Sequence, residues 1–293
     1  MNIPFLRDDS AVVGEVQQVA PGVRRLLCGN PGPFTWRGTN TYLIGEGGVA
    51  VLDPGPEDAA HLAAILKAVS GETVTHILVS HTHRDHSPGA RGLAEATGAP
   101  TLGFAPHMTR GQGGDEDFAP AIRLADGEAI PGDGWRLTAL HTPGHCANHL
   151  CFAMEGTGVL FSADHVMSWS STVVSPPDGN MRHYMNSLAK LRAREGRDSL
   201  YLPGHGPPLP EPMAFIDGLA AHRRRREARV VAALRELGRA TATALVGPVY
   251  GPMDPKLTGA AGRSLLANLL MLEEDGVVLR EGGDVPVFRL AAG

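Results

Sequence analysis

The strongest signal in this chain is the stretch His81-Thr82-His83-Arg84-Asp85-His86, which places four metal-ligand side chains within six residues. His81 and His83 are two residues apart, so a turning or extended backbone can direct both imidazoles to one metal ion. Asp85 and His86 follow in the same segment and can turn towards a second ion. Imidazole and carboxylate are ligands that zinc favours, and manganese and iron also accept them. A solvated polar loop is the alternative, but chance rarely gathers these residues so densely, and we therefore predict a metal centre.

Three further candidate ligands stand where predicted strands end. His145 closes Thr-Pro-Gly-His at 142–145, Asp164 lies in Ser-Ala-Asp-His at 162–165, and His205 lies in Pro-Gly-His-Gly at 203–206. Each alone would be an ordinary turn residue. Because loops at strand ends project side chains into shared clefts, their common position predicts that they join the same centre.

Short apolar runs alternate with helical periodicity through the first two thirds of the chain. Strands are predicted at 23–28, 41–44, 49–52, 75–79, 101–104, 135–140, 150–153, 159–161 and 201–202, and helices at 56–69, 88–97 and 188–194. This order predicts an α/β sandwich with a mixed sheet.

The composition changes at residues 206–212, which contain four prolines. We place a domain boundary there, giving a metal-binding domain at 1–209 and a smaller domain at 210–293. A long helix over 213–237, helices over 241–249 and 259–274, and a β-ribbon over 277–290 are typical of a winged-helix-like module.

The overall charge and the cysteines limit which partners and which cellular compartment we expect. A net charge of −5 and a pI of about 6.2 do not favour a protein whose whole surface binds nucleic acid. Three cysteines without a CxxC pair indicate a reducing compartment. The N-terminal residues do not resemble a secretory signal, and no apolar run approaches the roughly 20 residues needed to cross a bilayer. We expect a cytoplasmic protein that does not bind membranes; its oligomeric state stays open.

The series HxHxDH, TPGH, SADH and PGHG, in this order over residues 20–206, resembles the metallo-β-lactamase superfamily. The resemblance implies an αβ/βα sandwich with two divalent metal ions, with Zn²⁺ expected and Mn²⁺ or Fe²⁺ as alternatives. It also implies the ligand sets: one ion is held by His81, His83 and His145, the other by Asp85, His86 and His205, and Asp164 bridges them.

A finer resemblance points to one branch of that superfamily. Residues 30–33 and 38–43, Tyr184 to Leu188, and the closing 265–276 are similar to the lactamase-β-2-like proteins, which include single-strand-specific endoribonucleases. The resemblance implies single-stranded RNA as the favoured substrate. The Ser/Pro-rich loop 168–180 departs from the pattern, and we expect it near the mouth of the cleft.

The expected reaction is attack of a metal-activated hydroxide on an electrophilic carbonyl or phosphorus. Asp85 would bind metal and orient the attacking water. With two cations, two carboxylates and one hydroxide, the loaded centre would keep a net positive charge, which favours anionic substrates.

Some residues near the ligands are secondary candidates. His149 and His165 are candidates for supporting the ligands from behind, with ordinary polar filling as the equal alternative. His183 and Tyr184 are candidates for reaching the cleft and protonating a leaving group. The arginines at 223–226 and 229 point all round a helix, so we expect a solvated surface rather than an RNA contact.

Four alternatives remain open. A thioester hydrolase similar to glyoxalase II shares the motifs, although its C-terminal helices differ from the tail predicted here. A lactonase or β-lactamase is a second alternative; secreted β-lactamases carry a signal peptide and lack the bridging aspartate. A persulfide dioxygenase with a single iron is a third, which metal analysis would identify. A non-enzymatic nucleic-acid-binding protein is the fourth, and the full ligand set argues against it.

Overall fold

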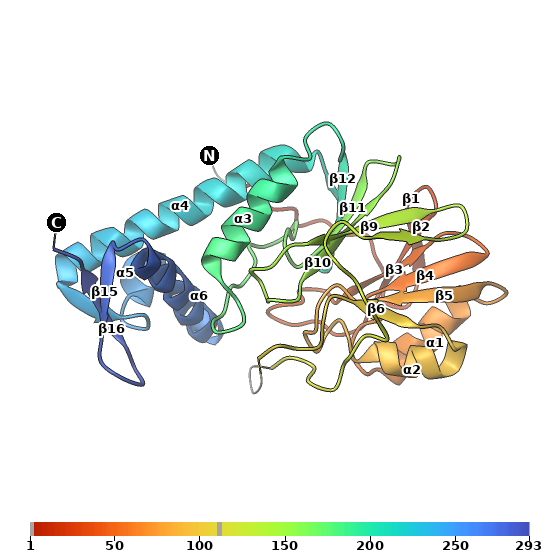
Figure 1. Ribbon diagram of the computed structural model, residues 1–293, viewed down its shortest axis with the longest axis horizontal. Helices are drawn as coiled ribbons and strands as arrows, with labels where there is room; N and C mark the ends of the chain where they lie inside the picture. Colours follow the sequence, from red (N-terminus) through yellow and green to blue (C-terminus); the bar gives the residue numbers. More distant parts are fainter. Residues whose placement is uncertain (1–2, 110–112, 293) are drawn as a thin grey trace.

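Two β-sheets pack face to face in the computed structural model, which describes residues 3–109 and 113–292 (Figure 1). The seven-stranded sheet has the order β1-β2-β3-β4-β5-β6-β7, and the six-stranded sheet has the order β13-β12-β11-β10-β9-β8. Their strands are β1 Val16–Ala20, β2 Val23–Leu27, β3 Asn40–Ile44, β4 Gly48–Leu52, β5 Thr73–Leu78, β6 Thr101–Gly103, β7 Ile122–Arg123, β8 Ala129–Pro131, β9 Arg136–His141, β10 Leu150–Met154, β11 Val159–Ala163, β12 Leu200–Pro203 and β13 Leu209–Pro210. Both sheets mix antiparallel pairs with parallel ones, β4 with β5 and β11 with β12 among them, as the sequence predicts.

The main core lies between the sheets, and helices cover their outer faces. Tyr42 of β3 meets Phe161 of β11 edge to face, with ring centroids 5.3 Å apart. Helices α1 (Ala59–Ala68) and α2 (Gly89–Thr97) bury apolar side chains against the first sheet. Helix α3 (Met181–Arg192) does the same against the second sheet. The layers therefore follow the order αβ/βα, which confirms the predicted sandwich.

Polar caps fix where the covering helices begin. The Asp58 side chain accepts hydrogen bonds from the backbone N–H groups of Ala60 and His61 at the start of α1. The Asn180 side chain accepts one from His183 N, and α3 therefore starts well before the predicted 188.

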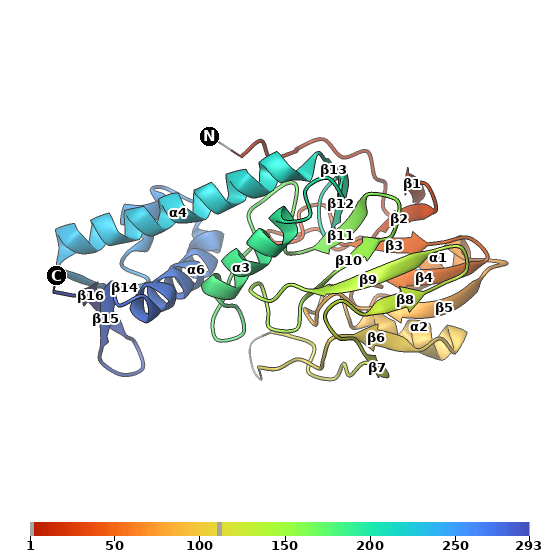
Figure 2. The ribbon, with the colours of Figure 1, turned by 45° about the horizontal axis from the view of Figure 1, so that its top comes forward.

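The C-terminal module begins with the long helix α4 (Pro212–Leu237), which runs along one side of the molecule (Figure 2). It continues with α5 (Val246–Tyr250), α6 (Pro255–Glu274) and a three-stranded sheet of order β14-β16-β15. These strands are β14 Arg239–Thr241, β15 Val278–Glu281 and β16 Val287–Leu290. The predicted winged-helix-like order is thus confirmed.

The module shares a core with the rest of the molecule. Met271 of α6 belongs to the same buried cluster as Tyr184 and Leu188 of α3. At the edge of this contact, Arg182 forms an ion pair with Asp275 at 2.6 Å. The predicted division after residue 209 stays a prediction, since that point falls inside β13 of the main sheet.

Within the described parts of the chain, no helix combines the length and apolar character needed to cross a bilayer.

Candidate metal centre

The first three predicted ligands converge through their ring nitrogens. His83 Nδ1 lies 3.0 Å from His81 Nε2 and 2.9 Å from His145 Nε2. The first two residues follow β5 directly, and His145 follows β9, so two different sheets supply this group.

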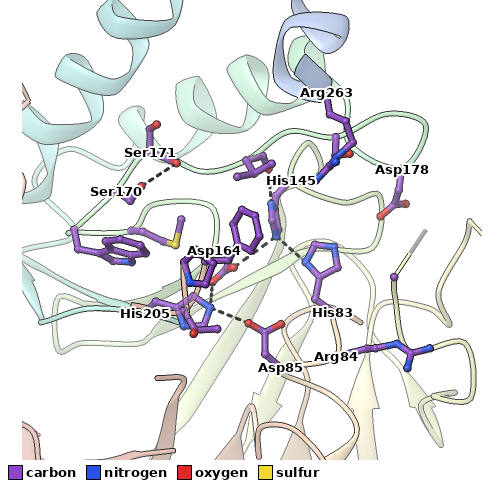
Figure 3. A pocket seen from close by; sticks show the side chains of 18 residues that line it. His83, Arg84, Asp85, His145, Asp164, Ser170, Ser171, Asp178, His205 and Arg263 are labelled. Carbon is purple, nitrogen blue, oxygen red and sulfur yellow. Dashed lines mark hydrogen bonds and ion pairs between the residues drawn. The ribbon is translucent and has the colours of Figure 1, made fainter. Parts of the chain in front are cut away.

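A second group lies beside the first and is joined to it by Asp164. His205 Nε2 lies 3.2 Å from Asp85 Oδ2 and 3.3 Å from His86 Nε2. Asp164 Oδ1 is 3.5 Å from both of these histidine nitrogens, while its Oδ2 is 3.6 Å from His145 Nε2 (Figure 3). Asp164 therefore faces both groups, in the position expected of a bridging carboxylate.

Hydrogen bonds behind the rings show that lone pairs point inward. His145 Nδ1 lies 2.7 Å from the carbonyl oxygen of Val173, which only accepts, so its proton is assigned to Nδ1 and Nε2 is left with a lone pair. Ser80 Oγ donates to Asp53 and lies 2.9 Å from His81 Nδ1, which assigns the His81 proton in the same way. The Nε2 lone pairs of His81 and His145 therefore both point towards His83 Nδ1.

This arrangement fits divalent cations. A tetrahedral zinc with nitrogen ligands at about 2.0–2.1 Å has ligand-to-ligand separations of roughly 3.3 Å, close to those found here. Asp164 Oδ1 is buried and has no hydrogen-bond partner among the described residues. Buried lone pairs and carboxylate oxygens that converge in this way need a positively charged partner, which a cation supplies. The seven residues therefore fit a pair of divalent metal ions.

The two groups differ in their affinity for protons. Burial lowers the pKa of His83 to about 3 and that of His81 also, so both are neutral and ready to coordinate. Burial would lower the pKa of His205 too, but the carboxylates of Asp164 and Asp85 outweigh it and raise the value to about 10. Metal binding at the second group must therefore displace protons.

Sequence reasoning missed Asp53, which holds one ligand of each group. Its carboxylate accepts hydrogen bonds from Ser80 N at 2.7 Å and Ser80 Oγ at 2.6 Å, and it lies 2.9 Å from His86 Nδ1. Through Ser80 it also positions His81. Its place directly after β4, at a strand end like the ligands, was the available signal.

Close packing behind the centre requires a glycine at position 204. A Cβ atom there would lie 2.5 Å from Asp164 Oδ1 and 2.8 Å from His86 Cε1. Because real Cβ contacts are not this short, any side chain at Gly204 would displace both ligands.

Three of the secondary candidates are buried behind the ligands. The His149 ring centroid is 5.1 Å from that of His81, and its Nδ1 lies 2.9 Å from Thr142 Oγ1. His165 packs on Tyr184 at 4.6 Å, and Tyr184 Oη donates to the His165 carbonyl at 3.2 Å. These residues support the loops that carry the ligands; none of the three lines the cavity.

The expectation that His183 and Tyr184 reach the cleft is wrong. Capping by Asn180 fixes the first turn of α3 so that Tyr184 points into the core and His183 points to solvent.

The expectation of a solvated arginine surface is also wrong for Arg223. Its side chain is buried, donates a hydrogen bond to the Thr172 carbonyl, and lies 4.9 Å from the Tyr184 ring centroid. The helix α4 packs against the loop 168–180 at this point, which the arginine-rich sequence does not reveal.

The centre forms the floor of a cavity of about 690 Å³. Part of its lining is apolar, and we call this part the apolar wall: Pro33, Phe34, Met167, Trp169 and Val173. Trp169 stacks on Trp36, with ring centroids 5.8 Å apart. The loop 168–180 supplies much of the rim, as expected from the sequence, and Arg84, Asp178 and Arg263 add charged groups.

Comparisons with known proteins show which families and structures the chain is similar to. The family model of the metallo-beta-lactamase superfamily matches residues 34–205, and that of the beta-lactamase associated winged helix domain matches 241–284. A beta-lactamase-like protein 2 homolog of Caenorhabditis elegans is 30% identical over 91% of this chain and 89% of its own. An atrochrysone carboxyl ACP thioesterase of Aspergillus chevalieri is 31% identical over 88% of this chain and 82% of its own. The crystal structure of a beta-lactamase domain protein from Burkholderia ambifaria is 26% identical, covers 97% of this chain and 96% of its own, and superposes with a TM-score of 0.83.

Proposed function

The chain belongs to the hydrolases of the metallo-β-lactamase superfamily, and from that premise we propose that it hydrolyses the thioester of an apolar or aromatic acyl group. The observation that carries the proposal is the apolar wall of Phe34, Met167 and Trp169, which lines the same cavity as five of the metal-ligand candidates. Such a wall suits an acyl chain or ring whose carbonyl carbon rests at the floor.

The leaving group gives a second reason. An alkoxide leaving from RNA needs a proton, and the two side chains expected to supply it, His183 and Tyr184, do not line the cavity. A thiol has an ordinary pKa of about 8.5, so a thiolate leaves without a protonating side chain. The thioesterase name of one relative points the same way.

The side chains of this chain have distinct roles in that reaction. Bound divalent ions would lower the pKa of water and polarise the substrate carbonyl. Asp85 lines the cavity and is held by His205 at 3.2 Å, so it is positioned to orient the attacking water and to receive its proton. Trp169 and Phe34 exclude bulk water from the acyl side.

Single-stranded RNA, favoured by the sequence, is the second candidate. Phe34 stays 45% exposed at the rim, where a base could stack on it, and Arg84 and Arg263 border the same cavity. The specific support is this combination of an exposed ring with two arginines that form no ion pair among the described residues.

The test offers both substrates to the purified, metal-analysed protein. We expect hydrolysis of a benzoyl thioester, a loss of about 10²–10⁴ in kcat with Asp85→Asn, no turnover after chelation, and an intact RNA oligonucleotide. Glu46→Gln, on an exposed hairpin, is the matched control. Cleavage of RNA with an untouched thioester would overturn the proposal in favour of the second candidate; a single iron with oxygen uptake on a persulfide would identify the dioxygenase.

A further inference from the structure

Arg263 brings the C-terminal module to the rim of the catalytic cavity. It lies on α6, is exposed, and lines the same cavity as His83, Asp85 and His145 (Figure 3). Arg84, which follows β5 in the main domain, lines the cavity as well. Two guanidinium groups from different parts of the chain thus border one cavity.

Among the residues that the structure describes, neither guanidinium forms an ion pair with a carboxylate. Within residues 3–109 and 113–292, Arg263 forms no ion pair, and Arg84 donates a hydrogen bond to the Gly114 carbonyl at 3.3 Å. The nearby acid of the rim, Asp178, instead accepts hydrogen bonds on its Oδ1 from Ala147 N at 3.3 Å and from Thr109 Oγ1 at 3.4 Å. The exposed guanidinium of Arg263 at the cavity rim is therefore available for a ligand.

The position of Arg263 between two cavities also indicates how a long substrate would be oriented. A second cavity of about 230 Å³, on the C-terminal module, is lined by Thr243, Thr258 and Pro286, and Arg263 lines it as well. A substrate longer than the first cavity would therefore pass Arg263. Since the apolar wall suits the acyl group, Arg263, which lines both cavities, is placed for the thiol arm that extends beyond the first cavity.

We propose that Arg263 binds a phosphate group on the thiol arm of the substrate. A planar guanidinium donates two parallel hydrogen bonds to phosphate oxygens, which a dephosphorylated arm cannot accept. This inference rests on the proposed thioester hydrolysis and adds to it that the C-terminal module selects phosphorylated arms, such as the phosphopantetheine of coenzyme A or of a carrier protein.

The test compares two substrates that differ by one phosphate, S-benzoyl-4′-phosphopantetheine and S-benzoyl-pantetheine. We expect the wild type to prefer the phosphorylated substrate by about tenfold or more in kcat/KM. Arg263→Ala should abolish the preference through a higher KM for the phosphorylated substrate, with kcat and the pantetheine reaction unchanged. Arg263→Lys should keep part of the preference. Lys256→Ala, which removes a positive charge from the exposed start of the same helix, should behave as wild type.

An equal loss on both substrates, or an unchanged preference in Arg263→Ala, would overturn the proposal. If the wild type hydrolyses neither thioester, the proposed function fails, but the phosphate site is still decided by calorimetry with 4′-phosphopantothenate. Weaker binding by Arg263→Ala than by wild type and Lys256→Ala would support the site, and equal binding by all three would overturn it. Rates with benzoyl-coenzyme A and with a benzoylated carrier protein then distinguish the two sources of the phosphorylated arm.

Discussion

At the scale of single residues, the centre depends on a carboxylate that is not itself a candidate ligand. Asp53 is buried and restrains His86 directly and His81 through Ser80. We predict that Asp53→Ala weakens metal binding by about 10–100-fold, because outer carboxylates of this kind orient ligands and raise their basicity. Competition with a chromophoric chelator measures this change. Asp53→Asn should fall in between, and an unchanged affinity in Asp53→Ala would contradict the positioning role.

The titration of the histidines predicts how the stability of the metal-free protein depends on pH. His205 has its pKa raised from 6.5 to about 10, so its stabilisation is complete below pH 6.5 and is lost as the pH rises towards 10. His83 has its pKa lowered from 6.5 to about 3, so stability is lost as the pH falls from 6.5 towards 3. Thermal melts of the metal-free protein should therefore show a maximum near pH 6.5.

A variant of His205 tests whether this residue causes the loss of stability at alkaline pH. His205→Gln should flatten the decline on the alkaline side and leave the part that comes from His86, whose pKa the same carboxylates also raise. A decline that is equally steep in this variant would assign the alkaline loss to other groups.

At the scale of secondary structure, what could be predicted depended on length and periodicity. The longer strands and α4 carry clear patterns, whereas β7, β13 and β14 are two or three residues long and have none. The seven candidate ligands could be proposed because four of them crowd into one six-residue motif and the other three each stand where a strand ends. The positions of His183 and Arg263 could not, since they follow from how α3 and α6 pack against the main domain.

The contact between α4 and the loop 168–180 yields a prediction at this scale. Arg223 donates to the Thr172 carbonyl, and Thr172 Oγ1 in turn donates to the Asp164 carbonyl at 2.6 Å. We predict that Arg223→Met lowers the free energy of unfolding by about 1–3 kcal/mol, because the buried carbonyl loses its charged donor. Urea denaturation measures this loss, and KM should rise because the loop forms the cavity rim. Arg224→Met, one residue further along and exposed, is the control; equal stabilities of the two variants would contradict the role of the contact.

At the scale of the whole molecule, the C-terminal module and the sandwich should unfold together. The cluster around α3 includes Phe215 and Leu219 of α4 and Met271 of α6, so neither part can open without exposing the other. We predict a single calorimetric transition for the full chain. Met271→Ala should move that one transition to lower temperature, with a loss of about 2 kcal/mol from the cavity it leaves, and should not split it. Two separate transitions would mean that the shared cluster does not couple the parts. In that case Arg263 would reach the catalytic rim only as often as the module docks, and the preference for a phosphorylated arm would fall as temperature approaches the first transition.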